Sequence, residues 1–435
     1  MIDPLHWSLL SGPVPIVLLA SAVVAFGALS ADRSRSWTWK APTALGVAVV
    51  LTALLGAFVD RWWRPFPEGL PPEVLLWIGI AILGGLIAAL RMPALSWRRR
   101  AGAVACTALV TVACANEVNR VFQYYPTPRA MLAQWLDHGT TFDTVAGHRA
   151  EVFAAPPGQL LADVWKPPEQ LPADGTLSQV TIPGTVSHFS ARKAWVYLPP
   201  AYQATPRPQL PLLVLLAGQP GSPRDWIDAV GLPKILDDYA AAHHGLAPVV
   251  VLPDATGTPL GNTLCMDSKL GNAETYLTTD LKAWVAANLQ VAPPGQGWTI
   301  GGFSFGGTCS LQLAVRAPDT YRTFLDVSGQ REPTLGNHRD TVKRAFGGDE
   351  AAFARADPIS VLNTRRFPEL AGRIVSGGSD REYTPQLRVV YRVCKKAGIE
   401  VEMTELPGGH AWQVPRGGLT RQLPWIAERS GLARG

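Results

Sequence analysis

The chain has 435 residues, of which 47% are hydrophobic and only 17% are charged, against about 25% charged residues in ordinary globular proteins. This composition excludes a disordered chain, which would need few apolar and many charged residues. The formal net charge of +5 is small for this length and disfavours nucleic-acid binding, which usually requires a dense basic face. We therefore expect a folded protein, part of which lies in lipid.

Four charge-free apolar stretches are the first predicted elements: 13–30, 41–59, 74–90 and 101–116. At about 1.5 Å rise per residue, a helix of this length spans roughly 25–28 Å, close to the hydrocarbon core of a bilayer. Buried helices of a large soluble core are the alternative, but here the charges gather in the connectors. We predict four transmembrane helices in a region that covers residues 1–118, with the first helix retained rather than cleaved as a signal peptide.

Basic residues in the connectors predict the orientation of these helices, because Lys and Arg accumulate on the cytoplasmic side. The first and third connectors are rich in Arg and Lys, whereas acidic residues outnumber basic ones in the second. We therefore expect a multi-pass plasma-membrane protein whose N-terminus and whole C-terminal part are extracytoplasmic. The residues behind this prediction are Arg33, Arg35, Lys40, Arg91, Arg98, Arg99 and Arg100 in the cytoplasmic connectors, and Asp60, Arg61, Arg64, Glu68 and Glu73 in the second connector.

The rest of the chain has the pattern of an α/β domain. Residues 119–170 are predicted to form a linker that also packs on a domain at 171–435. In that domain short apolar runs alternate with amphipathic helices, which is typical of a mostly parallel, buried sheet with helices on both faces. Strands are expected at 178–182, 193–198, 211–216, 248–252, 298–302, 323–327, 373–376 and 399–406, and helices at 226–242, 275–289, 310–317 and 384–397.

The segment 298–307 contains the pattern Gly302-x-Ser304-x-Gly306 between an apolar strand and a helical run. A strand, turn and helix of this kind form a nucleophile elbow, in which the serine occupies a sharp, strained turn and the glycines leave room for it. The N-terminus of the helix directs its positive dipole end toward developing negative charge. We predict that Ser304 is a catalytic nucleophile; a Gly-rich turn with an inert serine is the alternative.

A serine hydroxyl is a weak nucleophile and needs a base, and in this architecture the chain order is Ser, then Asp or Glu, then His. Of the two histidines after Ser304, His410 lies in a Gly-rich loop directly after the last predicted strand, whereas His338 lies in a polar helical stretch. We predict that His410 is the base. Asp380, in the loop after the preceding strand, is predicted to orient the imidazole, with Glu382 as the alternative acid.

The oxyanion hole of such a site uses backbone N–H groups. One is expected at Phe305, directly after the nucleophile. The other is expected in the loop 216–226 after the third predicted strand, where Gln219 is the best donor and Pro220 has no N–H. A plain turn is the alternative for this loop. No His/Cys cluster has metal-ligand spacing and no phosphate-binding loop appears, so neither a metal nor a cofactor is expected.

These segments resemble those of the Putative esterase family of α/β hydrolases, which includes esterase D, enterochelin esterases and the secreted mycolyltransferases of mycobacterial envelopes. The resemblance covers residues 177–430 and lies in the segments 213–221, 250–254, 302–307, 377–380 and 409–412. It implies an α/β-hydrolase catalytic domain at 171–435, and ester hydrolysis or acyl transfer with Ser304, Asp380 and His410 as the triad. Ala217 departs from it, because many members have His or Asp there. The membrane half resembles the anchors of actinobacterial envelope esterases.

Two cysteines lie near the predicted site. Cys265 is in a loop, and Cys309 is five residues past the nucleophile. Oxidising conditions outside the cytoplasm would permit a disulfide between them, which we predict; two buried thiols are the alternative.

The leading functional prediction is a membrane-anchored extracytoplasmic serine esterase that cleaves a carboxylic ester of an envelope lipid or an acylated glycan through an acyl-enzyme on Ser304. Its expected partners are the lipid bilayer and a small-molecule or lipid ester, without nucleic acid, and the sequence indicates no oligomeric state. An acyltransferase that passes the acyl group to an envelope alcohol would use the same residues. A catalytically inactive membrane scaffold is a third alternative.

Overall fold

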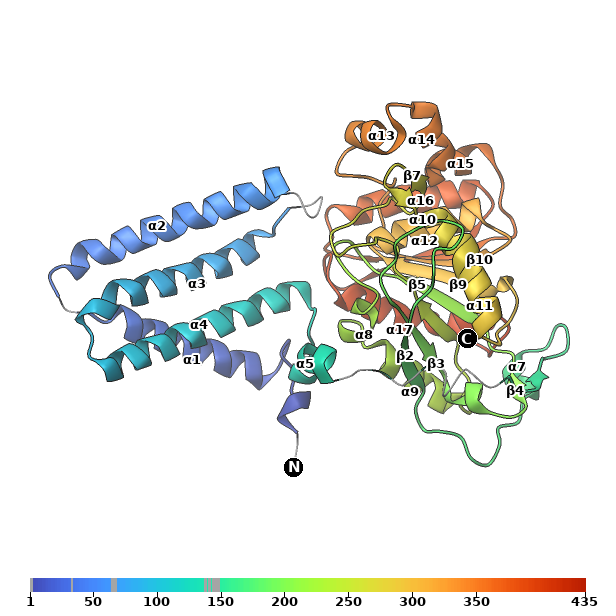
Figure 1. Cartoon of the computed structure of the whole chain (residues 1–435), viewed down its shortest axis with the longest axis horizontal. Coiled ribbons are helices and arrows are strands. Elements are labelled where there is room, and N and C mark those ends of the chain that lie inside the picture. Colours follow the sequence, from blue (N-terminus) through green and yellow to red (C-terminus); the bar gives the residue numbers. More distant parts are fainter. Residues whose placement is uncertain (1–2, 33, 64–68, 137–138, 140–141, 143–148) are drawn as a thin grey trace. The chain divides into compact units, whose positions relative to one another are not determined.

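The computed structural model of the chain describes residues 3–32, 34–63, 69–136, 139, 142 and 149–435 (Figure 1). It divides into two compact units, Met1–Ala133 and Gln134–Gly435. Of the residues behind the predicted orientation, Arg33, Arg64 and Glu68 lie outside the described residues.

Within the described part of the first unit, four helices are long and apolar enough to cross a membrane. They are α1 (Pro13–Ser30), α2 (Trp37–Ala57), which continues into a π-helical turn η2 (Phe58–Trp63), α3 (Pro72–Arg91) and α4 (Trp97–Phe122). The four predicted stretches all lie within these spans. The last three spans are longer than predicted, because each helix continues past its charge-free stretch into charged residues. Shorter helices, η1 (Pro4–His6), η3 (Met92–Ala94) and α5 (Pro128–Leu136), flank them.

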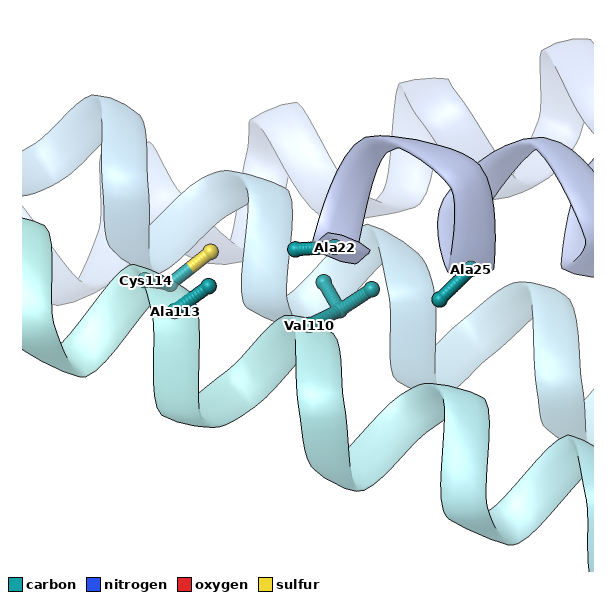
Figure 2. Close-up of a cluster of buried hydrophobic side chains, with 5 residues drawn as sticks. All are labelled: Ala22, Ala25, Val110, Ala113 and Cys114. Carbon is teal, nitrogen blue, oxygen red and sulfur yellow. The ribbon is translucent and has the colours of Figure 1, made fainter. Parts of the chain in front are cut away.

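Small side chains let α1 and α4 pack closely. Ala22 and Ala25 of α1 meet Val110, Ala113 and Cys114 of α4 in a buried cluster (Figure 2). In lipid there is little hydrophobic drive between helices, so close van der Waals packing of small residues is a main source of their attraction. Large apolar side chains face outward instead and are exposed on the surface of this unit. Both features suit a membrane region.

A mostly parallel sheet forms the core of the second unit. Among the described residues it has eight strands in the order β12-β11-β10-β9-β5-β6-β3-β2, and β3 alone runs antiparallel to its neighbours, β2 and β6. These strands confirm the eight predicted ones, with small shifts at their ends. They are β2 (Thr176–Val180), β3 (Ala194–Leu198), β5 (Leu212–Leu216), β6 (Val249–Leu252), β9 (Gly295–Phe303), β10 (Tyr321–Val327), β11 (Ala371–Gly377) and β12 (Glu400–Leu406).

Helices cover both faces of this sheet. Asp326 and Val327 are consecutive on β10 and therefore point to opposite faces. Asp326 lies against Gly307 of α12 (Phe305–Arg316), whereas Val327 lies against Gly418 of α17 (Gln413–Arg429). The two helices therefore lie on opposite sides of the sheet. A further helix, α16 (Tyr383–Lys396), packs on β11 and β12.

Two predicted helices are interrupted. The predicted helix 226–242 is in fact α8 (Asp225–Asp228) and α9 (Leu232–Ala242), because Gly231 has a φ of 74° and Pro233 lacks an N–H. The predicted helix 275–289 begins as α10 (Ala273–Thr275), passes through a π-helical turn η5 (Tyr276–Asp280) and ends as α11 (Leu281–Asn288).

The second unit also contains η4 (Pro200–Gln203), α13 (His338–Phe346), α14 (Glu350–Ala356) and α15 (Pro358–Thr364). Of these, η4, α14 and α15 lie outside the predicted elements, as does α17, whereas α13 contains His338, which was predicted to lie in a helical stretch. Asp349 and Asp357 cap the first N–H groups of α14 and α15 through their carboxylates. Short strands pair as β7 (Asp267–Ser268) with β8 (Gly271–Asn272).

Residues 149–175, which precede β2 and belong to the second unit, contact the rest of that unit. The strand β1 (Val152–Phe153) pairs with β4 (Arg207–Pro208). The helix α7 (Leu161–Val164) begins with a hydrogen bond of 2.9 Å from the Leu161 N–H to the carbonyl of Gly431.

Candidate active site

Ser304 occupies a strained turn between β9 and α12, with φ 57° and ψ −115°. A residue other than glycine in such a conformation costs on the order of 1–3 kcal/mol and persists only where its surroundings hold it. A Cβ at Gly302 would collide with the backbone of Gly306, and a Cβ at Gly306 would collide with the carbonyls of Leu216 and Ala217. Because only glycine fits at both positions, the backbone packs tightly enough to hold the serine in this turn.

The side chains of Ser304, His410 and Asp380 form one chain of hydrogen bonds. Nε2 of His410 lies 2.9 Å from Oγ of Ser304, and Nδ1 of His410 lies 3.0 Å from Oδ2 of Asp380. The three residues follow β9, β12 and β11, respectively. The carboxyl ends of neighbouring parallel strands meet at one edge of the sheet, where α/β proteins place their binding sites. The sheet order therefore explains why residues far apart in sequence meet here.

Asp380 is buried and is held by more than the imidazole. Its Oδ1 accepts the backbone N–H groups of Tyr383, at 2.9 Å, and Glu382, at 3.1 Å. Burial favours the neutral acid, but the hydrogen bonds from His410 and from these N–H groups outweigh it and hold the pKa of the carboxyl below its usual value. Asp380 is thus a carboxylate that can orient the imidazole and stabilise its protonated form.

The two alternative residues lie in other surroundings. The Glu382 carboxylate accepts a hydrogen bond of 3.1 Å from the Gln386 side chain. His338 lies on the surface between Glu350 and Glu332, at 3.0 Å and 3.4 Å. The structure therefore brings Asp380 and His410, rather than Glu382 and His338, to Ser304.

Two aromatic rings enclose the imidazole. The ring centroid of Phe303 lies 4.9 Å from that of His410 with nearly parallel planes, and the Tyr383 ring lies at 4.4 Å. These contacts restrict the rotation of the imidazole. Neither ring was among the predicted site residues, although Phe303 lies inside the elbow motif and Tyr383 is three residues past Asp380.

Backbone from two segments lies beside Ser304. Phe305 is the first residue of α12, so its N–H has no partner within the helix. In the loop after β5, a Cβ on Gly218 would lie 3.6 Å from Cβ of Ser304, so this backbone passes directly against the nucleophile. Gln219 follows, and its side-chain amide donates to the carbonyl of Leu260 at 3.2 Å. Both segments predicted to carry oxyanion donors therefore reach the serine.

A disulfide joins Cys265 to Cys309, with their Cα atoms 5.6 Å apart. It links the loop after β6 to α12, one turn past the nucleophile. The buried side chain of Gln312 reinforces this link, because its amide donates to the carbonyls of Leu264 and Cys265 at 3.2 Å and 2.8 Å. The loop and the helix are thus held together beside the site.

Comparison with known proteins gives a family and a fold. Residues 189–426 match the family model described as Putative esterase. An uncharacterized protein of Corynebacterium glutamicum is 33% identical over 432 residues, which cover 96% of this chain and 95% of its own length. That similarity includes the helices of the first unit as well as the second unit.

Two solved structures share the α/β fold at low sequence identity. A ferulic acid esterase is 17% identical, with a TM-score of 0.52, and the match covers 59% of this chain and 98% of that one. An S-formylglutathione hydrolase from Agrobacterium tumefaciens is 19% identical, with a TM-score of 0.50, and the match covers 61% of this chain and 99% of that one.

Proposed function

Because the chain belongs to the Putative esterase family, we propose that it is a membrane-anchored serine esterase with Ser304 as its nucleophile. The observation that carries this proposal is the hydrogen-bonded chain from Ser304 through His410 to Asp380, built on a strained turn at the start of a helix. Nucleophile, base and orienting acid in such contact are the parts that acyl transfer requires.

The reaction proceeds in two halves. Oγ of Ser304 attacks the ester carbonyl carbon while Nε2 of His410 takes its proton, and the Asp380 carboxylate stabilises the imidazolium. The N–H groups of Phe305 and Gln219 donate hydrogen bonds to the carbonyl oxygen as it becomes negatively charged. The alcohol leaves with the proton from His410, and an acyl-enzyme remains.

In the second half His410 removes a proton from the acceptor, which attacks the acyl carbon. The bond between that carbon and Oγ of Ser304 breaks, and His410 returns the proton to Oγ. When the acceptor is water, the product is a carboxylic acid. When it is an envelope alcohol, the product is a new ester and the protein acts as an acyltransferase. An assay of the products with candidate alcohols distinguishes the two outcomes.

We place the esterase on the extracytoplasmic side of the plasma membrane, where an envelope lipid or an acylated glycan would be its substrate. Two observations support this placement. The first and third connectors of the membrane region carry most of its basic residues, which is typical of cytoplasmic loops, and the Cys265–Cys309 disulfide suits an oxidising compartment. Reporters fused after residue 130 test it: alkaline phosphatase should be active there and a cytoplasmic reporter inactive, and the reverse would contradict it.

Hydrolysis of a p-nitrophenyl ester by the full chain in detergent tests the enzymatic proposal. The wild type should turn the ester over, and Ser304→Ala should lower kcat/KM by several orders of magnitude while the protein keeps its thermal unfolding profile. Equal turnover by the variant and the wild type would overturn the role of Ser304.

A further inference from the structure

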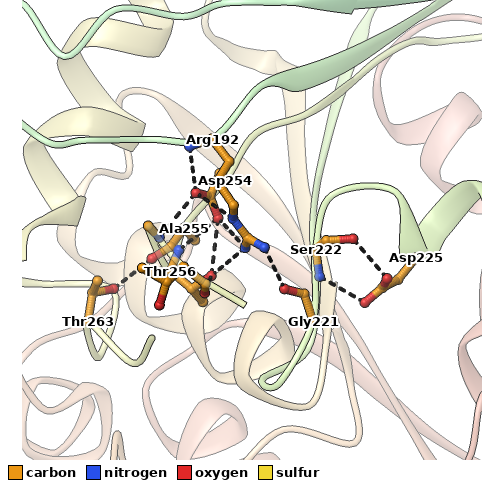
Figure 3. Close-up of polar contacts among 10 residues, drawn as sticks. Arg192, Gly221, Ser222, Asp225, Asp254, Ala255, Thr256 and Thr263 are labelled. Carbon is orange, nitrogen blue, oxygen red and sulfur yellow. Dashed lines mark hydrogen bonds and ion pairs between the residues drawn. The ribbon is translucent and has the colours of Figure 1, made fainter. Parts of the chain in front are cut away.

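A second polar cluster lies at the same edge of the sheet as the nucleophile and takes no part in the steps above. Arg192 precedes β3, and Asp254 follows β6 (Figure 3). The two strands are antiparallel, with Trp195 paired with Leu252, so the start of one lies beside the end of the other. The Asp254 side chain is 1% exposed and the Arg192 side chain 25% exposed. The fold therefore buries most of an ion pair at the edge of the sheet where Ser304 lies.

The guanidinium of Arg192 is held in one orientation. Its Nε lies 3.1 Å from Oδ2 of Asp254 and its Nη2 lies 2.7 Å from Oδ1, which is a two-point contact. The backbone N–H of Arg192 also donates to Oδ2, at 2.8 Å, and Nη2 donates to the Thr256 hydroxyl, at 2.7 Å. Burial alone would raise the pKa of Asp254, but these bonds outweigh it and lower that pKa. The pair is thus charged and rigid.

The third nitrogen of the Arg192 guanidinium, Nη1, contacts the loop after β5. It donates to the carbonyl of Gly221 at 3.0 Å. On the other side of the same residue, the Gly221 N–H donates to the carbonyl of Pro259 at 3.0 Å. Gly221 is two residues past Gln219 and three past Gly218, whose backbone lies against Ser304. Arg192 is therefore the bridge between the buried carboxylate of Asp254 and the loop that borders the nucleophile.

We propose that Arg192 is a positioning residue for the oxyanion hole, because it fixes the loop 217–224 in the place where the Gln219 N–H meets the transition-state oxygen. This inference rests on the proposed function. A guanidinium can serve a carboxylate and a carbonyl at once through its planar fork, whereas the compact ammonium of a lysine cannot reach both. Donors of an oxyanion hole act on the transition state, so a displaced loop weakens transition-state binding more than substrate binding.

The test uses the variant Arg192→Lys in the full chain in detergent. Its activity is divided by the amount of protein whose Ser304 reacts with a fluorophosphonate, so that only correctly folded sites are counted. Misplacement of a reacting group by about 1 Å costs about 10²-fold, so kcat for a p-nitrophenyl ester should fall by about 10²-fold. KM should stay within about twofold of the wild type. A trifluoromethyl ketone, whose adduct with Ser304 places an oxyanion in the hole, should lose affinity by the same factor as kcat/KM.

Arg316→Lys is the matched control. Arg316 also joins a carboxylate, Glu274 at 2.8 Å, to a backbone carbonyl, that of Arg355 at 2.7 Å, and its side chain is 27% exposed. It lies at the far end of α12 from Ser304. Arg316→Lys should lose about as much stability as Arg192→Lys. Unlike Arg192→Lys, it should keep the wild-type kcat and the wild-type affinity for the trifluoromethyl ketone.

If Arg192→Lys does not fold, Asp254→Asn replaces it, since it loosens the guanidinium without removing it. A fall in kcat and in ketone affinity, with KM unchanged, again supports the inference. The inference would be overturned if kcat per reactive serine and the affinity for the ketone equalled those of the wild type. It would also be overturned if they changed no more than in Arg316→Lys. A wild-type chain that neither reacts with the fluorophosphonate nor hydrolyses the ester would overturn the proposed function, and this inference with it.

Discussion

Asp380 and His410 are 30 residues apart in the chain, yet Oδ2 of the carboxylate lies 3.0 Å from Nδ1 of the imidazole. The pairing of β11 with β12 makes this contact possible, because it continues in parallel to Gly377 and Leu406, the last residues before the two loops. With Nδ1 engaged, Nε2 is left to face the Ser304 hydroxyl at 2.9 Å. The sheet register thus brings the two loops together, and the contact between Nδ1 and Asp380 leaves Nε2 for the nucleophile.

Asp380→Asn should abolish most of the activity without disturbing the fold. An amide at this position favours the wrong tautomer of His410 and cannot stabilise its cation, so kcat should fall roughly 10³- to 10⁴-fold. Turnover of a p-nitrophenyl ester measures this. Glu382→Gln is the control, and it should remain within about twofold of the wild type, since its side chain bonds to Gln386. If Glu382→Gln lowered kcat more than Asp380→Asn, the acid would be Glu382 instead.

Gly306→Ala should destabilise the elbow. The added Cβ would meet the carbonyl oxygens of Leu216 and Ala217, which are backbone atoms that cannot move aside easily. The expected loss is roughly 1–3 kcal/mol or more of unfolding free energy, with loss of activity. Denaturation of the full chain in detergent measures it.

The control for this change is Gly417→Ala in α17, where the new Cβ would meet only the end of the Leu406 side chain. Its stability should be unchanged or slightly higher, because alanine is the better helix former. Equal stability of Gly306→Ala and the wild type would show that the turn is not as tightly packed as the structure has it.

Removal of the disulfide by Cys265→Ser together with Cys309→Ser should lower the unfolding free energy by about 4 kcal/mol, the chain-entropy value for a closed loop of 44 residues. Cys106→Ser, a half-buried thiol of α4, should leave the second unit unaffected. Alkylation without a reductant, followed by mass spectrometry of protein from intact cells, tests the bond itself. Alkylation of both Cys265 and Cys309 in that experiment would show that they are free thiols.

Asp326 should make the stability depend on pH. Its carboxyl group is buried between β10 and α12, Oδ1 accepts the Gly329 N–H at 2.9 Å, and Oδ2 has no hydrogen-bond partner among the described residues. Burial, opposed by that one hydrogen bond, raises its pKa from 3.8 to about 7. The folded state therefore holds the proton more tightly than the unfolded state. Stability should fall by up to about 4 kcal/mol as the pH rises from about 4 to 7, and then level off.

The isosteric variant Asp326→Asn isolates this contribution, since its amide does not titrate. The denaturant midpoint of the wild type should be lower at pH 8 than at pH 5 by more than that of the variant. Identical changes in the two proteins would mean that Asp326 does not carry the pH dependence.

Much of the second unit was predictable, because its strands can be recognised in the sequence. β5 and β6 are buried on both faces and therefore appear as continuous apolar runs. The elbow was predictable as well, since the glycines at 302 and 306 are required by close backbone contacts. Chain order and the position of His410 in the loop after the last strand were sufficient to select it over His338.

Other features depend on contacts that no local pattern shows. Arg192 and Asp254 meet because β3 runs antiparallel to β6, and the sequence does not specify that pairing. The predicted helix at 226–242 breaks at Gly231, which adopts a positive φ. The helix α17 contains Gly417, Gly418 and Pro424, which disfavour a helix locally, but its packing on four strands overrides that preference.

The central claim is that Ser304 is the activated nucleophile of the chain, and labelling with a fluorophosphonate tests it most directly. The full chain in detergent is treated with the probe, digested, and mapped by mass spectrometry. We expect one adduct, on the peptide that contains Ser304, and no adduct in Ser304→Ala or after heat unfolding. An adduct on another residue, or equal labelling of Ser304→Ala, would contradict it.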